Sequence, residues 1–332
     1  MAKTKAQAAQ RTRPAARPRA RAHDPDRLNR LLVVGGVVAI IVIALGFIAF
    51  GWYQTQIKPL GKTILVVGDT KYSLGHLERR MRFLRTQSGG YFEGQNLLQL
   101  PDSTVSQLER EGKLLWGAGK LNITVTEADL SGEIRLRGGL SDAATSEEFA
   151  TEFRRQVKDS GLHDGEFRQM LTAQLLESRV RDYFTYLAPA TETQVLARWI
   201  VVDGQEKVDQ VVARLNAGDD FVAVGQELSL DPAGAERGQT DTDWLPHGSF
   251  PNDDVESFLF DAAPGARSDP ISVGDYLYVV QLLNREENHP LGDAQREQVV
   301  DRDMTAWLDG LDVKVENRLT TADASKAIKD II

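Results

Sequence analysis

The uncharged stretch at residues 31–53 constrains this chain more than any other feature. It contains no Asp, Glu, Lys or Arg and is apolar almost throughout. As a helix rising 1.5 Å per residue it would be about 34 Å long, enough to cross a hydrocarbon core of about 30 Å. Trp52 and Tyr53 close the stretch, and such rings favour the headgroup layer. We therefore predict a transmembrane helix at residues 31–53, in contact with membrane lipid.

A cleaved signal peptide is the alternative interpretation of this stretch. Ala49 and Gly51 flank Phe50 and form a small-x-small cleavage pattern. Signal peptides usually have an apolar core of about 7–15 residues, and the present core is longer. It also ends in aromatic residues, which are unfavourable next to a cleavage point. Both features favour a permanent anchor over a removed leader.

Charge is distributed unevenly on the two sides of the predicted helix. Residues 1–30 hold nine Lys/Arg and two Asp/Glu, whereas the rest of the chain holds 30 Lys/Arg and 46 Asp/Glu. The positive-inside rule then predicts a single-pass protein of the cell membrane, with a cytoplasmic N-terminus and an extracytoplasmic C-terminal portion. The basic head is too polar to bury a core, so residues 1–30 are predicted to be disordered. The anchor explains their charge, and nucleic acid is not an expected partner.

Composition limits the chemistry available to the remaining residues. The chain has no cysteine, which excludes structural disulfides, thiol catalysis and cysteine-ligated metals. Its five histidines are scattered without the helical spacing of a metal site. The sequence contains neither GxGxxG nor GxxxxGKS/T for nucleotide phosphates, and no Gly-x-Ser-x-Gly elbow for a nucleophile. We therefore expect no metal and no other cofactor.

Apolar residues at three- and four-residue spacing predict a mostly helical region after a linker at residues 54–62. A strand is expected first, at residues 63–67, followed by a Gly-Asp turn. Ser73 is a typical N-cap for the next helix, which has an apolar stripe. The stripe consists of Leu74, Leu77, Met81 and Leu84. Two further helices are predicted on either side of residues 161–164.

Residues 191–287 have a different pattern, in which two β-rich runs enclose a helical segment. The runs lie at residues 195–202 and 276–283. The sequence between them has several landmarks in a fixed order. These are Asp231-Pro232, Gly238 followed by Trp244, the pair Phe258 and Phe260, Pro264-Gly265, and Ser268. The whole run is about 90 residues long, which is a normal size for a compact α/β domain.

The order and spacing of these landmarks resemble the parvulin-type peptidyl-prolyl isomerase domain of SurA-, PrsA- and PpiD-like foldases. Parvulins usually open with Ala-Arg-His-Ile, whereas this chain has Trp199 at the histidine position. They usually close with an aromatic-His pair, and here Tyr278 takes the place of that histidine. The resemblance implies a four-stranded antiparallel sheet covered by helices. It also implies that both core histidines have been replaced.

The likeness extends over nearly all of the chain after residue 60. A strand, a Gly-Asp turn and a helix starting near Ser73 resemble the start of the SurA N-terminal chaperone domain. In SurA-like proteins the end of the chain returns to complete that domain. We therefore expect residues 313–319 to form a strand that pairs with residues 64–67. A helix should precede it, and residues 320–332 are predicted to be a polar tail that can hold a short helix.

Together these features predict an α+β fold with an insertion. A mostly helical SurA-like chaperone domain at residues 63–190 would be completed by a helix and strand at residues 288–319. A parvulin-like α/β domain at residues 191–287 would be inserted between these two parts. Unfolded or newly exported polypeptides with X-Pro segments are the partners that the resemblance implies. A regulator that couples the outer domains to the basic head is a further, less favoured option.

The resemblance also implies the residues of a proline-binding site. Asp241 and Tyr278 would be the catalytic polar groups, and the substrate-binding walls would be Trp199, Phe250, Val255 and Phe260. Amide resonance sets a barrier of about 18–20 kcal/mol for rotating a peptide bond. A dry apolar pocket can lower it without a covalent step. Two interpretations remain: the domain is an isomerase without its histidines, or the pocket has become packing in a module that only binds clients.

Overall fold

The computed structural model describes residues 25–240, 243–250 and 252–332, and only the backbone of residues 25–34 and 56. The chain divides into two compact units, Met1–Leu60 and Gly61–Ile332. The described residues are mostly helical, with two antiparallel sheets in the second unit.

The described part of the first unit is one long helix, α1 (Pro25–Trp52), that continues into shorter helical turns. These are a π-helical turn at Tyr53–Ile57 and a 3-10 turn at Lys58–Gly61, so the predicted linker at residues 54–62 is largely helical. The helix begins six residues before the predicted span, because Pro25 suits a first helical turn. Residues 25–30 of the predicted disordered head are therefore helical, and residues 1–24 lie outside the described part.

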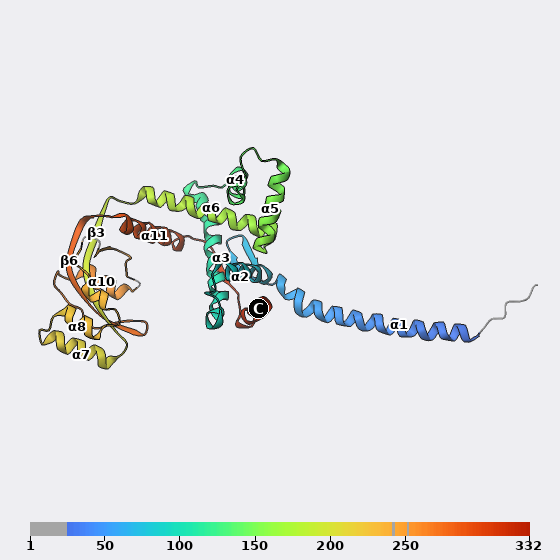
Figure 1. Ribbon diagram of the computed structural model, residues 1–332, viewed down its shortest axis with the longest axis horizontal. Coiled ribbons are helices and arrows are strands. Elements are labelled where there is room, and N and C mark those ends of the chain that lie inside the picture. The colour runs from blue at the N-terminus through green and yellow to red at the C-terminus, as the bar shows by residue number, and fades with distance from the viewer. Residues whose placement is uncertain (1–24, 241–242, 251) are drawn as a thin grey trace, which may run out of the picture. The chain divides into compact units, whose positions relative to one another are not determined.

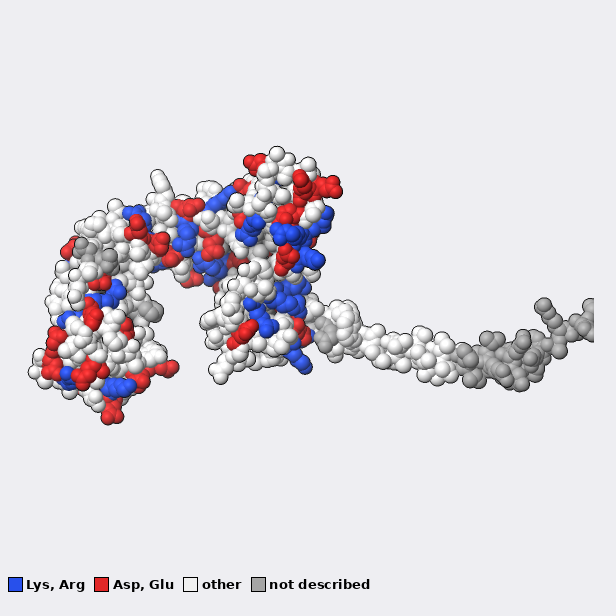
Figure 2. All heavy atoms as spheres, viewed as in Figure 1, with Lys and Arg blue, Asp and Glu red and all other residues white. Residues whose placement is uncertain are grey.

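The described helix at Gly35–Gly61 is long and apolar enough to cross a membrane. Length and composition are the two criteria it meets, and a signal sequence near an N-terminus meets them as well. Its side chains are exposed from Gly35 onward, as an apolar solvent would require. Residues 35–55 of this helix contain no Lys, Arg, Asp or Glu, whereas both signs intermingle on the visible face of the second unit (Figure 2).

The second unit begins with a three-stranded antiparallel sheet that joins the two ends of this unit. Its strands are β1 (Thr63–Val67), β2 (Thr70–Ser73) and β7 (Val315–Asn317), in the order β2-β1-β7. Leu65 pairs with Asn317 and Val67 pairs with Val315. This register confirms the prediction that the C-terminal strand returns to the first strand of the SurA-like region.

Helices then build most of this region, largely where the apolar spacing predicts them. They are α2 (Leu74–Gln87), η3 (Gly94–Gln99), α3 (Leu100–Gly117), η4 (Ala118–Leu121), α4 (Glu127–Gly138), α5 (Ser146–Ser160) and α6 (Asp164–Leu187). Ser73 caps α2, since its hydroxyl accepts a hydrogen bond from the His76 N–H at 3.2 Å. The stripe of α2 joins β1 and α3 in one buried core.

Two C-terminal helices complete the packing. Helix α11 (Asp293–Asp309) lies against α6 and α3, where Met304 and Leu308 pack on Leu176 and Val180 (Figure 1). Helix α12 (Thr321–Ile331) packs on α2 and α3. The short helix that the prediction for residues 320–332 allowed is therefore present, but it packs on the core instead of forming a polar tail. Isolated apolar residues in a polar segment gave little signal, yet Ala327 and Ile331 are buried in the core.

The α/β region contains the predicted four-stranded antiparallel sheet. Its strands are β3 (Thr191–Val202), β4 (Trp244–Pro246), β5 (Ile271–Val273) and β6 (Tyr276–Pro290), in the order β4-β3-β6-β5. Strand β6 is longer than predicted and crosses the expected boundary at residue 287. The associated helices are α7 (Gln205–Asn216), α8 (Phe221–Leu228), α9 (Pro232–Glu236) and α10 (Asp253–Asp261) (Figure 1).

The alternation of β3 divides its side chains between two apolar layers. Ile200 and Val202 pack with α7 and α8 on one face of the sheet. Val195 and Ala197 pack with α10 on the other face, where Trp199 also lies. Successive residues of a strand point to opposite faces, so one short run supplies both layers. The second layer is where the candidate site forms.

Candidate functional site

The structure brings together the five predicted site residues that it describes. All belong to one apolar cluster on the α10 side of the four-stranded sheet. Val255 is buried at its base, and four aromatic side chains are half-buried around it. These are Trp199, Phe250, Phe260 and Tyr278. The sixth predicted residue, Asp241, lies outside the described residues.

Trp199 is the most tightly held member of this cluster. Its indole N–H donates a hydrogen bond to Asp231 Oδ2 at 2.8 Å. The Phe250 ring meets it edge to face, with centroids 5.7 Å apart. Gly234 packs so closely that a Cβ there would lie 2.2 Å from the indole nitrogen. The polar partner of Trp199 in this structure is therefore Asp231, a residue that was not predicted as part of the site.

Asp231 is positioned by the short helix that it begins. It is the N-cap of α9, and its Oδ1 accepts a hydrogen bond from the Gly234 N–H at 3.1 Å. Its other carboxylate oxygen, Oδ2, faces β3, on which α9 packs, and accepts the Trp199 indole N–H. The sequence signal for it is the Asp-Pro pair, since Asp is a preferred N-cap and Pro a preferred first helical residue. That signal predicts a cap, and only the fold reveals the contact with Trp199.

The loop between α9 and β4 is organised by Asp243, a second residue that the sequence did not single out. Its Oδ2 accepts hydrogen bonds from three consecutive backbone N–H groups, those of residues 238–240, at 3.0 to 3.1 Å. The Thr240 hydroxyl adds another at 3.0 Å. Burial would raise the pKa of Asp243, but these hydrogen bonds outweigh it and hold the pKa below its usual range.

Tyr278 occupies the opposite part of the cluster, on β6. It pairs with Ile271 of β5 and Val201 of β3 and is half-buried. Among the described residues its hydroxyl has no hydrogen-bond partner. Trp199 and Tyr278 share the apolar layer, but no described hydrogen bond links them. Their expected common network around Asp241 stays a prediction.

Phe260 brings a histidine to the site that the sequence did not predict. The His247 ring stacks on Phe260 with centroids 3.5 Å apart. Its Nδ1 lies 3.1 Å from Glu256 Oε1, an oxygen that also accepts the Gly248 N–H at 2.7 Å. His247 follows β4 and Glu256 lies on α10, so their proximity depends on the tertiary fold. A local sequence pattern could not have indicated this pair.

This arrangement is suited to holding an apolar group rather than to covalent chemistry. Its walls are aromatic rings, and its polar groups are one carboxylate, one phenol and one imidazole at the margin. No cluster of three or more metal-ligating side chains occurs among the described residues. A proline ring seated against such walls would lose contact with water. The chemistry available is therefore desolvation and hydrogen bonding to a peptide group.

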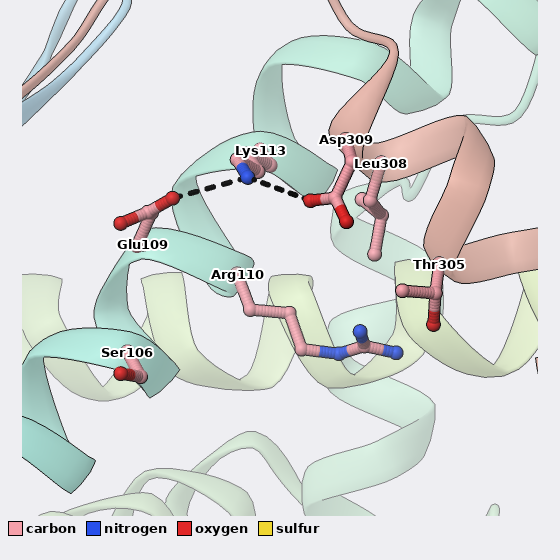
Figure 3. A pocket seen from close by; sticks show the side chains of 7 residues that line it. All are labelled: Ser106, Glu109, Arg110, Lys113, Thr305, Leu308 and Asp309. Carbon is pink, nitrogen blue, oxygen red and sulfur yellow. Dashed lines mark hydrogen bonds and ion pairs between the residues drawn. The ribbon is translucent and has the colours of Figure 1, made fainter. Parts of the chain in front are cut away.

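A separate cavity of about 260 Å³ lies between α3 and α11, and Figure 3 shows its lining. Lys113 is held between Glu109 Oε1 at 3.0 Å and Asp309 Oδ1 at 3.1 Å. Arg110, on its margin, donates to Glu177 Oε1 at 2.9 Å. Both cations are thus paired with carboxylates of the protein itself. We therefore place the candidate site at the aromatic cluster.

Comparison with known proteins defines the class of this chain. Residues 28–181 match the family model of the SurA-like N-terminal domain. The matched range runs from α1 into α6 and includes β1, whose partner β7 returns from the other end of the unit. The chain therefore carries a SurA-like N-terminal domain.

Individual relatives narrow this class further. Foldase protein PrsA of Geobacillus sp. (strain WCH70) is 22% identical over 121 residues, which are 36% of this chain and 42% of the relative. Foldase protein PrsA of Oceanobacillus iheyensis is 23% identical over 181 residues, 52% of this chain and 58% of the relative. The chain thus spans about half the length of the curated relatives it matches. Over the matched residues it is similar to SurA- and PrsA-like foldases.

Solved structures in the comparison include further PrsA proteins. The crystal structure of peptidylprolyl isomerase PrsA from Bacillus anthracis covers 68% of this chain and 94% of its own chain. Its TM-score is 0.39 and its sequence identity 11%. PrsA from Bacillus subtilis covers 82% of this chain and 92% of its own, with a TM-score of 0.25 and 13% identity.

Proposed function

We propose that this protein is a membrane-anchored extracytoplasmic foldase with a parvulin-type peptidyl-prolyl isomerase domain. The SurA-like region would hold unfolded or newly exported polypeptides, and the inserted domain would isomerise their X-Pro bonds. Helix α1 would anchor the chain, with its N-terminus in the cytoplasm. The observation that carries this proposal is the aromatic cluster on the four-stranded sheet, within a chain related to PrsA foldases.

The proposed mechanism needs no covalent intermediate and no cofactor. Phe250 and Phe260 would contact the proline ring, with Val255 beneath it. Removing water disfavours the planar amide, whose resonance form carries separated charge, relative to the twisted transition state. Tyr278 has an uncommitted hydroxyl that can donate a hydrogen bond to the client. Asp241 keeps its proposed catalytic role from the family resemblance alone.

A binding-only chaperone is the second candidate, and the environment of Trp199 favours it. The indole N–H is committed to Asp231, and both Phe250 and Gly234 press on the ring. A tryptophan held in this way can serve as packing where an imidazole would have titrated. In that case the inserted domain would bind client segments without accelerating their isomerisation.

A prolyl isomerisation assay on the full chain separates the two candidates. The rate for a short Ala-Pro peptide would be measured for the natural protein and for Phe250→Ala, Asp241→Ala and Tyr278→Phe. Tyr186→Phe is the matched control, because Tyr186 is 87% exposed. Acceleration that falls in the first three variants and persists in the control supports the isomerase. No acceleration, together with suppressed aggregation of an unfolded client, supports the binding-only chaperone.

A further inference from the structure

One face of helix α11 contacts β4 and the loop that follows it, which carries part of the aromatic cluster. The contacting side chains are spaced three and four residues apart, which places them on the same face of the helix. They are Gln295, Gln298 and Arg302. Gln295 Nε2 donates to the Trp244 carbonyl at 3.2 Å, and Gln298 Oε1 lies 3.4 Å from the Ser249 hydroxyl oxygen. This face of α11 therefore follows the segment from the first residue of β4 into the loop.

Arg302 makes the closest contacts of this face. Its Nη1 donates to the His247 carbonyl at 3.1 Å and to Glu192 Oε1 on β3 at 2.6 Å. Its Nε donates to Asp303 Oδ1 at 2.8 Å. The aliphatic stem lies against Gly248, where a Cβ would be 3.0 Å from Arg302 Cδ. The guanidinium thus joins the loop to β3, while the stem packs on the backbone of the loop.

The segment that Arg302 holds supplies two ring contacts of the proposed proline site. The His247 ring stacks on Phe260 with centroids 3.5 Å apart, and the Phe250 ring meets Trp199 edge to face. His247 and Phe250 are three residues apart on one short loop. Fixing the His247 carbonyl therefore limits where both of these rings can lie.

A different face of α11 is buried in the SurA-like region. Met304 and Leu308 pack there on Leu176 and Val180 of α6. With about 3.6 residues per turn, Met304 and Leu308 lie on the other side of the helix from Arg302. Helix α11 therefore stands between the core of the SurA-like region and the loop of the proposed proline site.

We propose that Arg302 is a positioning residue, located outside the inserted domain, that holds the loop at residues 247–250 in the conformation that binds proline. This inference rests on the proposed function, because it takes the aromatic cluster as the proline site. Without the guanidinium, the loop would be ordered only when a client binds, at a cost in conformational entropy. The same rings contact the proline before and during rotation of the bond. The loss should therefore raise KM more than it lowers kcat.

The Arg302→Met variant of the full chain tests this inference. Methionine keeps an unbranched stem against Gly248 but has no hydrogen-bond donor. We expect KM for the short Ala-Pro peptide to rise about 10-fold, with kcat changed by less than about 2-fold. Arg296→Met is the matched control on the same helix, because Arg296 Nη1 donates to the Ala188 carbonyl at 3.3 Å, away from the loop. It should keep the natural KM.

A double variant separates positioning from stability. Glu192 Oε2 is buried without a hydrogen-bond partner among the described residues, so loss of Arg302 leaves a largely buried carboxylate without its cation. Arg302→Met should therefore melt at a lower temperature than the natural chain. Adding Glu192→Leu removes the unpaired charge and should restore much of the thermal stability. The raised KM should persist, because the His247 carbonyl still has no donor.

The outcomes separate this inference from the proposed function when the Kd of the same Ala-Pro peptide is measured by calorimetry beside the rates. Acceleration with KM raised in Arg302→Met and in the double variant, and unchanged in Arg296→Met, supports both. A natural KM in Arg302→Met, an equal rise in Arg296→Met, or a KM that recovers with thermal stability would overturn the positioning role and leave the isomerase intact.

The remaining outcomes concern a natural chain that does not accelerate isomerisation. A Kd that weakens only in the two variants lacking Arg302 would then overturn the isomerase and support the positioning role in a binding-only module. Absence of both acceleration and peptide binding would overturn the proposed function and the positioning role together.

Discussion

At the scale of single residues, Trp199 shows how a substitution can redirect a hydrogen bond. An imidazole has two ring nitrogens and can both donate and accept, whereas an indole has one N–H and can only donate. In this chain the indole N–H meets Asp231, an acceptor supplied by the cap of α9. The substituted side chain thus has a satisfied partner of suitable chemistry. The polar group of Trp199 is therefore compensated within the cluster.

Removing the Asp231 carboxylate should cost more than removing an ordinary helix cap. Asp231→Ala loses the cap of α9 and leaves a half-buried indole N–H without its partner, so we expect about 2–3 kcal/mol of destabilisation. Asp220→Ala is the matched control, because Asp220 caps α8 through the Ala223 N–H at 2.9 Å and has no indole contact. It should cost about 1 kcal/mol. Equal losses in urea denaturation would show that the indole bond contributes nothing.

His76 should make stability depend on pH in the acid range. It is 6% exposed, and burial lowers its pKa to about 4, although the negative charge of Glu166 acts to raise that pKa. The unfolded chain therefore binds more protons than the folded one between pH 6.5 and 4. The contribution of this histidine is complete above pH 6.5 and is lost as pH falls toward 4, by about 3 kcal/mol in total.

Comparison of variants isolates this effect from other titrating groups. Burial raises the pKa of Glu111 to about 6, so that carboxyl favours the folded state at low pH and partly masks His76 in the natural protein. His76→Gln should remove the histidine contribution and flatten the loss between pH 6.5 and 4. The His163 side chain is 70% exposed, so His163→Gln should leave the dependence of stability on pH unchanged. Parallel profiles for His76→Gln and the natural chain, from urea titrations of residues 61–332, would contradict the assignment.

At the scale of secondary-structure elements, α12 is the element whose importance the sequence conceals. It packs on α2 and α3 and buries Ile331 with Ala327 in the core of the SurA-like region. Ile331→Ala should lower the free energy of unfolding by about 2 kcal/mol, because a buried side chain leaves a cavity. Ile332→Ala is an adjacent control, since Ile332 is 78% exposed and should change stability little. Similar thermal melts for the two variants would show that α12 does not stabilise this region.

Sequence reasoning succeeded where a local pattern determined the structure. The stripe on α2, the cap at Ser73 and the alternating strands each follow from side-chain periodicity or turn chemistry, and the family resemblance supplied the pairing of β7 with β1. It was less successful where tertiary contacts decide, as in α12 and in the choice of Asp231 as the partner of Trp199. The His247 pair with Glu256 belongs to the same group. Such contacts join residues whose own neighbours in sequence show nothing unusual.

At the scale of the whole molecule, the second unit has one sheet built from its two ends and another sheet built from its middle. Residues from both ends of the second unit form one sheet through β1 and β7, and the four-stranded sheet lies between them in sequence. An insertion of this kind can be altered at its own surface without breaking the sheet that its host domain requires.

The proposed anchor makes a prediction about the whole chain. If α1 is retained as a transmembrane helix, the full chain should stay with the membrane pellet after an alkaline carbonate wash. Insertion of about 20 apolar residues in lipid does not depend on charge pairing, so the wash does not reverse it. Externally added protease should digest residues 61–332 in cells whose membrane is intact, since the basic head fixes the orientation. Replacing six apolar residues at positions 37–43 by Ser and Asn should release the chain, whereas shuffling the order of the same apolar residues should not. A soluble product whose N-terminus begins after Gly51 would instead identify the segment as a cleaved signal peptide.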